Sequence, residues 1–245
     1  VMAYGQLLKE DFLAAPRLGF VNFHGSLLPE LRGATPVEGA LALGLAETGV
    51  SLQQVVRKLD AGPIHAAAKT AIRPGEGRAA LRARLGVIAG ELAAAALPSV
   101  LAGTSVAIPQ DESKVTFARR LSRADAPLDF RQPAAALRQR ILAVEGWPGS
   151  TFDHRAALIK VGAASAEDAA ASVAPGTIIA ADRAGVKIAC GEGLLVLTQL
   201  QRPGGKMLPA GEFLAGYPLA VGEVLASAAM PAFVSDRPFP RAPKA

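Results

Sequence analysis

The sequence is poor in several residue types, and each shortage removes a class of structure. A single cysteine, Cys190, excludes an internal disulfide and fits a reducing compartment, so we expect a cytoplasmic location. Cys190 ends an apolar, strand-like run, which favours burial in a core. Only three histidines occur, and neither a His-x-x-x-His nor a paired-cysteine spacing is present, so a zinc site has no support.

Long apolar runs are also scarce. The most alanine-rich tract, residues 89–97, contains Glu91 and is too short to span a bilayer, so we expect no membrane partner. The first residues lack the ordered charged and apolar regions of a signal peptide, and no Gly-x-Gly-x-x-Gly or Walker loop occurs. At 245 residues with 51% hydrophobic and 19% charged content, the chain predicts a soluble globular protein with one large or two small domains.

Positive charge exceeds negative charge, and it is concentrated in one region. The formal net charge is +5, and the segment 119–140 has six arginines against two acids, Asp125 and Asp129. Such a patch favours an anionic partner such as nucleic acid. The alternative is a solvated helix face in a chain that uses arginine throughout. The six are Arg119, Arg120, Arg123, Arg131, Arg138 and Arg140.

The first hundred residues alternate strand-like and helix-like segments, the pattern of an α/β layer fold. Thr35, Pro36 and Glu38 predict a helix start closed by a capping box between Thr35 and Glu38. We expect strands at residues 1–3, 20–23, 50–56 and 64–72, and helices at 9–15, 36–45 and 78–97.

The second half has a different character. Residues 107–130 are polar and lack a sustained period, which is typical of an inter-domain linker. A helix is expected at 134–144, and short apolar runs with Gly or Pro turns then predict a small β-barrel or sandwich. Those strands are expected at 151–152, 157–161, 177–180, 186–190 and 194–200, before a loose Pro-rich tail.

Two polar side chains interrupt the strand at 20–23 and its continuation. Asn22 and His24 are two residues apart, so a strand places them on one face, directly before Gly25. Open α/β sheets bind ligands at the carboxyl ends of strands, which makes this pair a candidate reaction centre. The alternative is a histidine with a purely structural role.

A third polar residue, Asp60, follows the next strand. In a parallel sheet its carboxylate would lie beside His24, although Asp-Ala-Gly-Pro also suits an ordinary turn. Together Asn22, His24 and Asp60 suit acyl transfer: the amide stabilises an oxyanion, the imidazole donates or moves a proton, and the carboxylate orients it. Because Ser26 points into a turn, the nucleophile would come from the substrate, for example as an amine.

Several segments resemble a known family. Asn22-Phe23-His24-Gly25-Ser26-Leu27-Leu28-Pro29, Arg32-Gly33, Thr35-Pro36, Thr48-Gly49-Val50 and Leu59-Asp60-Ala61-Gly62 follow in order with loop-compatible spacing. In these the chain resembles the formyltetrahydrofolate-dependent formyltransferases. Over residues 1–228 it is most similar to the members that formylate methionyl-initiator tRNA, through Trp147-Pro148-Gly149, Lys160-Val161, Pro175-Gly176-Thr177-Ile178 and Gly205-Lys206.

The resemblance implies a fold and a division into domains. It implies an α/β, Rossmann-like formyltransferase domain with an incomplete parallel sheet, followed by a small OB-like β-barrel that helps to hold tRNA. Because the family's catalytic domain begins well before Val1, we expect a fragment with little transferase activity of its own. The expected divisions are 1–104 for the catalytic portion, 105–122 for a linker, 123–228 for the barrel and 229–245 for the tail.

The resemblance also implies the reaction and the residues. Asn22, His24 and Asp60 match the family's catalytic trio, and a formyl group would pass from 10-formyltetrahydrofolate to the amine of methionyl-initiator tRNA. We expect no metal and a monomer. The residues expected to bind the folate are Ser26, Leu27, Leu28, Pro29, Tyr4 and Gly5.

Two other functions stay open at this stage. Formyl transfer to a nucleotide-linked amino sugar uses the same chemistry on another acceptor. An inactive fragment that binds RNA without turnover would show salt-dependent binding alone.

Overall fold

The computed structural model describes residues 13, 15–170 and 172–240. The strand expected at 1–3, the proposed folate residues Tyr4 and Gly5, and most of the helix expected at 9–15 lie outside the described residues. The chain divides into two compact units, which are described separately. Unit 1 comprises Val1–Ala40, Leu45–Arg120 and Ala232–Ala245, and unit 2 comprises Leu41–Gly44 and Leu121–Pro231.

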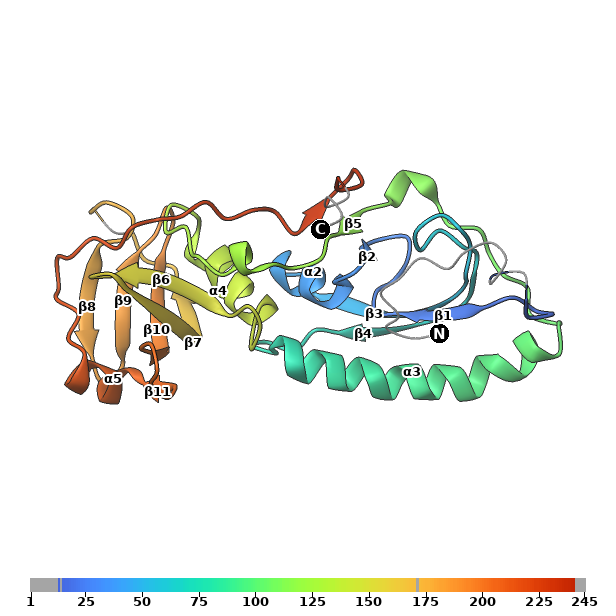
Figure 1. The fold of residues 1–245 in the computed structure, drawn as a ribbon, viewed down its shortest axis with the longest axis horizontal. Coiled ribbons are helices and arrows are strands. Elements are labelled where there is room, and N and C mark those ends of the chain that lie inside the picture. Colours follow the sequence, from blue (N-terminus) through green and yellow to red (C-terminus); the bar gives the residue numbers. More distant parts are fainter. Residues whose placement is uncertain (1–12, 14, 171, 241–245) are drawn as a thin grey trace. The chain divides into compact units, whose positions relative to one another are not determined.

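Among the described residues, the main sheet of unit 1 has three strands in the order β1 (Val21–His24), β3 (Glu47–Gln54) and β4 (Ile64–Ala71) (Figure 1). Both pairs are antiparallel, so the expectation of a parallel sheet is wrong for these strands. For β3 and β4 the physical reason is the short connection: residues 55–63 turn the chain straight back, whereas a parallel pair needs a long crossover. The strands themselves lie close to the predicted positions.

A long helix, α3 (Arg78–Leu101), packs along this sheet (Figure 1). Its buried residues Leu81, Leu85 and Ala89 recur at helical spacing and face the strands. The predicted helix at 78–97 is confirmed and continues four residues further, through Pro98. By length and composition alone α3 is apolar enough to cross a membrane, which differs from the expectation drawn from residues 89–97.

A shorter helix, α2 (Pro36–Ala42), begins at the predicted proline but without the predicted capping box. The Glu38 side chain is almost fully buried, and its Oε1 accepts a hydrogen bond from Arg82 Nη2 at 2.8 Å. A buried carboxylate needs a cationic partner, and this need outweighs the local cap. Thr35 Oγ1 instead donates to the Arg119 carbonyl.

A second small sheet of unit 1 joins segments that are distant in sequence. Its order is β12 (Val234–Ser235), β5 (Phe117–Ala118) and β2 (Arg32–Gly33), with β2 parallel to β5. A single 3-10 turn, η1 (Glu112–Lys114), precedes β5. The segments expected to be a linker and a loose tail therefore both contribute strands here.

Unit 2 is built on one antiparallel sheet of six strands. Its strands follow the order β6-β7-β10-β9-β8, and β11 also pairs with β10. Among the described residues, no hydrogen-bonded ladder joins the two end strands, β6 and β8. The expected closed barrel is therefore not formed by the described strands; α4 and α5 pack against the sheet. The strands are β6 (Ser150–His154), β7 (Ala157–Glu167), β8 (Ile178–Asp182), β9 (Gly185–Ala189), β10 (Leu194–Gln201) and β11 (Leu208–Pro209).

The core of unit 2 lies between this sheet and its helices. The helices are α4 (Ala134–Ala143) and α5 (Ala210–Gly216), with a 3-10 turn, η2 (Arg123–Asp125), before α4. Phe130 and Phe152 meet edge to face inside the core. Cys190 is buried as predicted, and burial raises the pKa of its thiol to about 11, so it is a core side chain and not a reactive thiol.

Candidate active site

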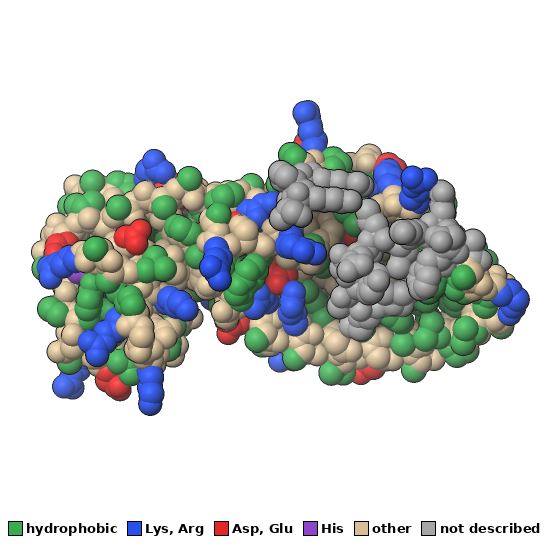
Figure 2. Space-filling model, viewed as in Figure 1, with side chains coloured by type: hydrophobic (Ala, Val, Ile, Leu, Met, Phe, Trp, Pro, Cys, Tyr) green, Lys and Arg blue, Asp and Glu red, His purple; other side chains and the backbone are tan. Residues whose placement is uncertain are grey.

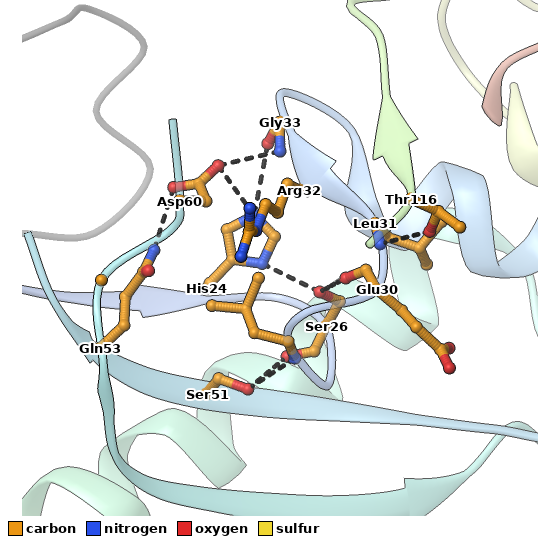
Figure 3. A network of polar contacts seen from close by, with 12 residues as sticks. His24, Ser26, Glu30, Leu31, Arg32, Gly33, Ser51, Gln53, Asp60 and Thr116 are labelled. Atoms are coloured by element: carbon orange, nitrogen blue, oxygen red, sulfur yellow. Dashed lines mark hydrogen bonds and ion pairs between the residues drawn. The ribbon is translucent and has the colours of Figure 1, made fainter. Parts of the chain in front are cut away.

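His24 and Asp60 form a buried pair in unit 1 (Figure 3). The Nε2 atom of His24 lies 3.4 Å from Oδ2 of Asp60, and the two side chains are only 6% and 16% exposed. The Asp60 carboxylate also accepts hydrogen bonds from Gly33 N at 2.8 Å and Gln53 Nε2 at 3.0 Å. Both oxygens of the Asp60 carboxylate therefore have partners within the site.

The contact between His24 and Asp60 was predicted from neighbouring parallel strands, but the structure forms it in a different way. Because β1 and β3 are antiparallel, the end of β3 lies opposite Val21, at the far end of β1 from His24. The loop 55–63 must return along the sheet to bring Asp60 to His24. Asp60 has a positive φ of 45°, a backbone conformation that few residues other than glycine adopt.

The environment keeps Asp60 ionised. Burial by itself raises the pKa of the Asp60 carboxyl, but the hydrogen bond and charge of His24, the Gly33 N–H and the Gln53 amide outweigh it. The pKa of Asp60 is therefore below its ordinary value. The carboxylate therefore places a negative charge beside the His24 ring.

The other ring nitrogen of His24 has a fixed role. Its Nδ1 lies 3.0 Å from Ser26 Oγ, and that hydroxyl donates its own proton to the Glu30 carbonyl at 2.7 Å. The Ser26 oxygen therefore accepts, and Nδ1 carries a proton. On the opposite side Nε2 faces two acceptors, the Asp60 carboxylate and the Gly33 carbonyl, both at 3.4 Å. Nε2 therefore points toward acceptors and not toward donors.

Four polar residues share one face of the sheet. The register pairs Asn22 with Gln53 and His24 with Ser51, and opposite residues in a ladder point the same way. Gln53 and Ser51 are almost fully buried. Sequence reasoning missed both, although their i, i+2 spacing on β3 mirrors that of Asn22 and His24.

The serines of the site are structural. Ser51 Oγ accepts from Leu28 N at 3.0 Å and donates to the Ser26 carbonyl at 2.8 Å, which ties the loop after β1 to β3. Ser26 and Ser51 are both fully buried. Neither hydroxyl is free to act as a nucleophile.

Asn22 is the polar side chain of this face that remains available. It is half-buried, and within the described part of the chain its side chain has no hydrogen-bond partner. It lies two residues before His24 on β1 and thus on the same face. An amide in this position can donate to an oxygen of a bound substrate.

The segment expected to bind folate is only partly accessible. Ser26 and Leu28 are buried, whereas Leu27 and Pro29 are half-buried, and the Leu28–Pro29 peptide is cis. A small pocket of about 190 Å³ adjoins the segment and includes Ser26, Leu27 and Thr48 in its lining. The described residues contain no cluster of three or more His, Cys, Asp or Glu side chains that could hold a metal.

Three of the six arginines in the segment 119–140 make contacts within the fold, whereas Arg120 and Arg123 are exposed. In unit 1, Arg119 donates to the Ala232 and Arg120 carbonyls. In unit 2, Arg140 is buried and pairs with Asp125, and Arg131 pairs with Asp129 through two hydrogen bonds. These arginines stabilise the fold, so the prediction of an anionic partner no longer rests on them.

His24, the ionised Asp60 and the Asn22 amide lie together, and the nearby hydroxyls of Ser26 and Ser51 are buried and hydrogen-bonded. Among the described residues, this arrangement suits acyl transfer between two substrates. The chain belongs to the formyl transferase family: residues 1–101 match its domain described as formyl transferase, and residues 120–218 match the formyl transferase C-terminal domain.

The relatives specify the branch of the family. The chain is 45% identical over 224 residues to a methionyl-tRNA formyltransferase of Burkholderia thailandensis, and the match covers 91% of this chain and 68% of that protein. Another methionyl-tRNA formyltransferase, of Burkholderia pseudomallei, is 45% identical over 229 residues, which cover 93% of this chain and 70% of that protein.

Solved structures show the same fold at low sequence identity. HypX from Aquifex aeolicus in complex with tetrahydrofolic acid has a TM-score of 0.59 and 18% identity over 85% of this chain. This chain spans 38% of HypX, well under half of its length. WlaRD, a sugar 3N-formyl transferase, has a TM-score of 0.65 and 13% identity, and the match covers 84% of this chain and 72% of that chain.

Proposed function

We propose that this chain transfers a formyl group from 10-formyltetrahydrofolate to the amino group of methionyl-initiator tRNA. The observation that carries the proposal is the polar face of the β1-β3-β4 sheet. There His24 contacts the loop residue Asp60 and shares β1 with Asn22, whose side chain has no hydrogen-bond partner among the described residues. The relatives at 45% identity are methionyl-tRNA formyltransferases, which supports this acceptor.

In the reaction, the methionyl amine attacks the formyl carbon and forms the new C–N bond. The carbonyl oxygen becomes an oxyanion, to which Asn22 and the Nε2–H of His24 donate. When the intermediate collapses, the bond from the formyl carbon to the folate N10 breaks, and the proton lost by the amine balances the charge on N10. The pKa of the Asp60 carboxyl is below its ordinary value, so this group is ionised and its negative charge faces Nε2 of His24.

No covalent protein intermediate is needed. The hydroxyls of Ser26 and Ser51, which lie nearest to His24 in the described network, are buried and hydrogen-bonded (Figure 3). The attacking group is the amine of the acceptor, so catalysis consists of positioning and electrostatic stabilisation.

For the tRNA we propose contacts with unit 2. Figure 2 shows Lys and Arg side chains projecting from the surface of this unit. Lys160 is exposed and pairs in register with Gln201, next to the exposed Arg202 and Lys206. Basic side chains on neighbouring strands of a sheet suit the phosphate backbone of RNA, the role expected for an OB-like domain. We also propose that the protein acts as a cytoplasmic monomer.

The decisive experiment measures formyl transfer with purified protein, 10-formyltetrahydrofolate and methionyl-initiator tRNA. His24→Ala and Asn22→Ala should each lower kcat by roughly 10²–10³-fold, because each removes a donor to the oxyanion. Asp182→Asn is the control, since Asp182 is an exposed residue at the end of β8 in unit 2. Robust turnover by the 245-residue chain itself would show that the expectation of little activity is wrong.

Two further measurements distinguish the proposed function from the two alternative functions. A nucleotide-linked amino sugar replaces the tRNA as acceptor, because WlaRD is a sugar formyl transferase of similar fold. Formylation of the sugar with none of the tRNA would overturn the proposed acceptor. Salt-dependent tRNA binding without transfer to either acceptor would identify an RNA-binding remnant.

A further inference from the structure

The Asp60 carboxylate reaches His24 only because its loop holds an unfavourable conformation. Residues 56–59 are exposed, so few apolar contacts hold this part of the loop. Asp60 has φ of 45°, a conformation that costs a non-glycine residue free energy unless the surroundings impose it. Residues outside the loop must therefore stabilise the backbone conformation of Asp60.

Gln110 makes stabilising contacts with the backbone of this loop. Its Nε2 donates to the Asp60 carbonyl at 2.8 Å and to the Gly62 carbonyl at 2.7 Å. The two carbonyls flank the turn that follows Asp60, so one side-chain amide holds both ends of it. Gln110 lies just before η1, in the segment that the sequence predicted to be a linker.

Gln110 is itself held from the other side by Arg32. Its Oε1 accepts from Arg32 Nε at 3.0 Å and from Nη2 at 2.7 Å. The Arg32 side chain is fully buried, and its Nη2 also donates to Glu112. Because Arg32 adjoins Gly33, whose N–H donates to the Asp60 carboxylate, the anchor and the catalytic pair belong to one network.

We propose that Gln110 is a positioning residue, which imposes the backbone conformation of Asp60 through its side-chain amide and so holds the Asp60 carboxylate against His24. The role in turnover rests on the proposed formyl transfer, whereas the effect on the Asp60 carboxylate does not. Gln110 touches no reacting atom. It determines whether the charge that supports the proton on His24 is in place.

The test is a titration of the Asp60 carboxyl carbon by NMR, assigned through its loss in Asp60→Asn. Gln110→Met removes both donors without adding charge, and Gln110→Glu removes the donors but keeps acceptors for Arg32. In both variants we expect the Asp60 midpoint to rise toward the ordinary value, because the carboxylate moves away from His24, Gly33 and Gln53. Gln110→Met should also lower kcat by roughly 10–100-fold with KM changed less than about 2-fold.

The matched control is Asp111→Ala, which removes the acceptor that caps η1 beside Gln110 but touches neither Arg32 nor the Asp60 loop. It should leave the Asp60 titration unchanged. An unchanged Asp60 midpoint in folded Gln110→Met protein would overturn the inference, whatever the activity. A shift in Gln110→Glu alone would also overturn it, because the added charge would then be the cause. Loss of transfer in the parent protein with a shifted midpoint in both variants would reject the proposed function and leave the positioning role intact.

Discussion

His24 and Asp60 lie 3.4 Å apart across a sheet whose strands run in opposite directions. The sheet places His24 at the end of β1, but it does not place Asp60, which comes from a loop that returns from the far end of β3. The register thus fixes one partner and the loop contacts fix the other. Changes in the loop should therefore affect chemistry more strongly than they affect the stability of the fold.

Asp60→Asn tests this pairing directly. The substitution keeps the size of the side chain but removes its charge, so the proton at Nε2 of His24 loses its ionic partner. We expect kcat to fall by roughly 10²-fold or more while the protein remains folded. Steady-state formyl transfer and a thermal melt measure the two effects. Asp60→Asn protein with normal kcat would mean that the carboxylate has no part in the reaction.

Gly33→Ala should damage both the fold and the site. Gly33 has φ of 117°, and a Cβ atom there would lie 2.5 Å from the Ala118 carbonyl oxygen on β5. The Gly33 peptide also contacts both His24 and Asp60. We expect a loss of about 1–3 kcal/mol in the free energy of unfolding, together with lower activity.

Gly86→Ala on α3 is the matched control. A Cβ atom at Gly86 would meet nothing within 4 Å, and the residue is helical. Alanine there should raise the free energy of unfolding by about 0.4–1 kcal/mol, since glycine costs more conformational entropy on folding. Urea unfolding of both variants checks the pair. Equal effects at the two positions would show that the close approach of Gly33 to β5 is unimportant.

Ser26→Ala distinguishes two roles for the same side chain. The resemblance implies a residue that binds folate, whereas the structure shows a buried hydroxyl that accepts from His24 Nδ1. If it positions the ring, kcat should fall about 10-fold with the KM for the formyl donor nearly unchanged. A raised KM at normal kcat would favour the folate role instead. Ser113→Ala, at an exposed serine of η1, controls for the loss of a hydroxyl.

Much of the fold could be predicted because its signals are local. The starts of α2 and α3 follow from a proline at the first helical position and from apolar residues at helical spacing. The strand β4 follows from a run of apolar residues between turns. By contrast, β2, β5 and β12 have two residues each, and no periodic pattern extends over so short a length.

The site could be predicted in part for the same reason. Asn22 and His24 stand out because they interrupt one strand, and the proximity of Asp60 was expected, although from a parallel sheet. Their partners could not be predicted in this way. The antiparallel register places Gln53 in the site, and Gln110 contacts Asp60 across a separation of 50 residues in the sequence. Tertiary contacts of this kind leave no local pattern.

Glu223 gives unit 2 a defined sensitivity to acid. The Ala220 N–H, Arg155 and His154 all donate to its carboxylate and lower the pKa of Glu223 to about 2. Because this pKa is depressed in the folded protein, the stabilisation is complete above the ordinary value of 4.5 and is lost as pH falls from there toward about 2.

Glu223→Gln should therefore lower the stability of unit 2 near neutral pH and flatten its decline between pH 4.5 and 2. Urea unfolding followed by circular dichroism at a series of pH values measures both. Glu212→Gln is the control, since Glu212 is an exposed glutamate of α5, and its curve should run parallel to that of the parent. If the Glu223→Gln curve is also parallel to the parent curve through this interval, the contacts of Glu223 do not contribute to folding, and the acid sensitivity of unit 2 must come from other carboxylates.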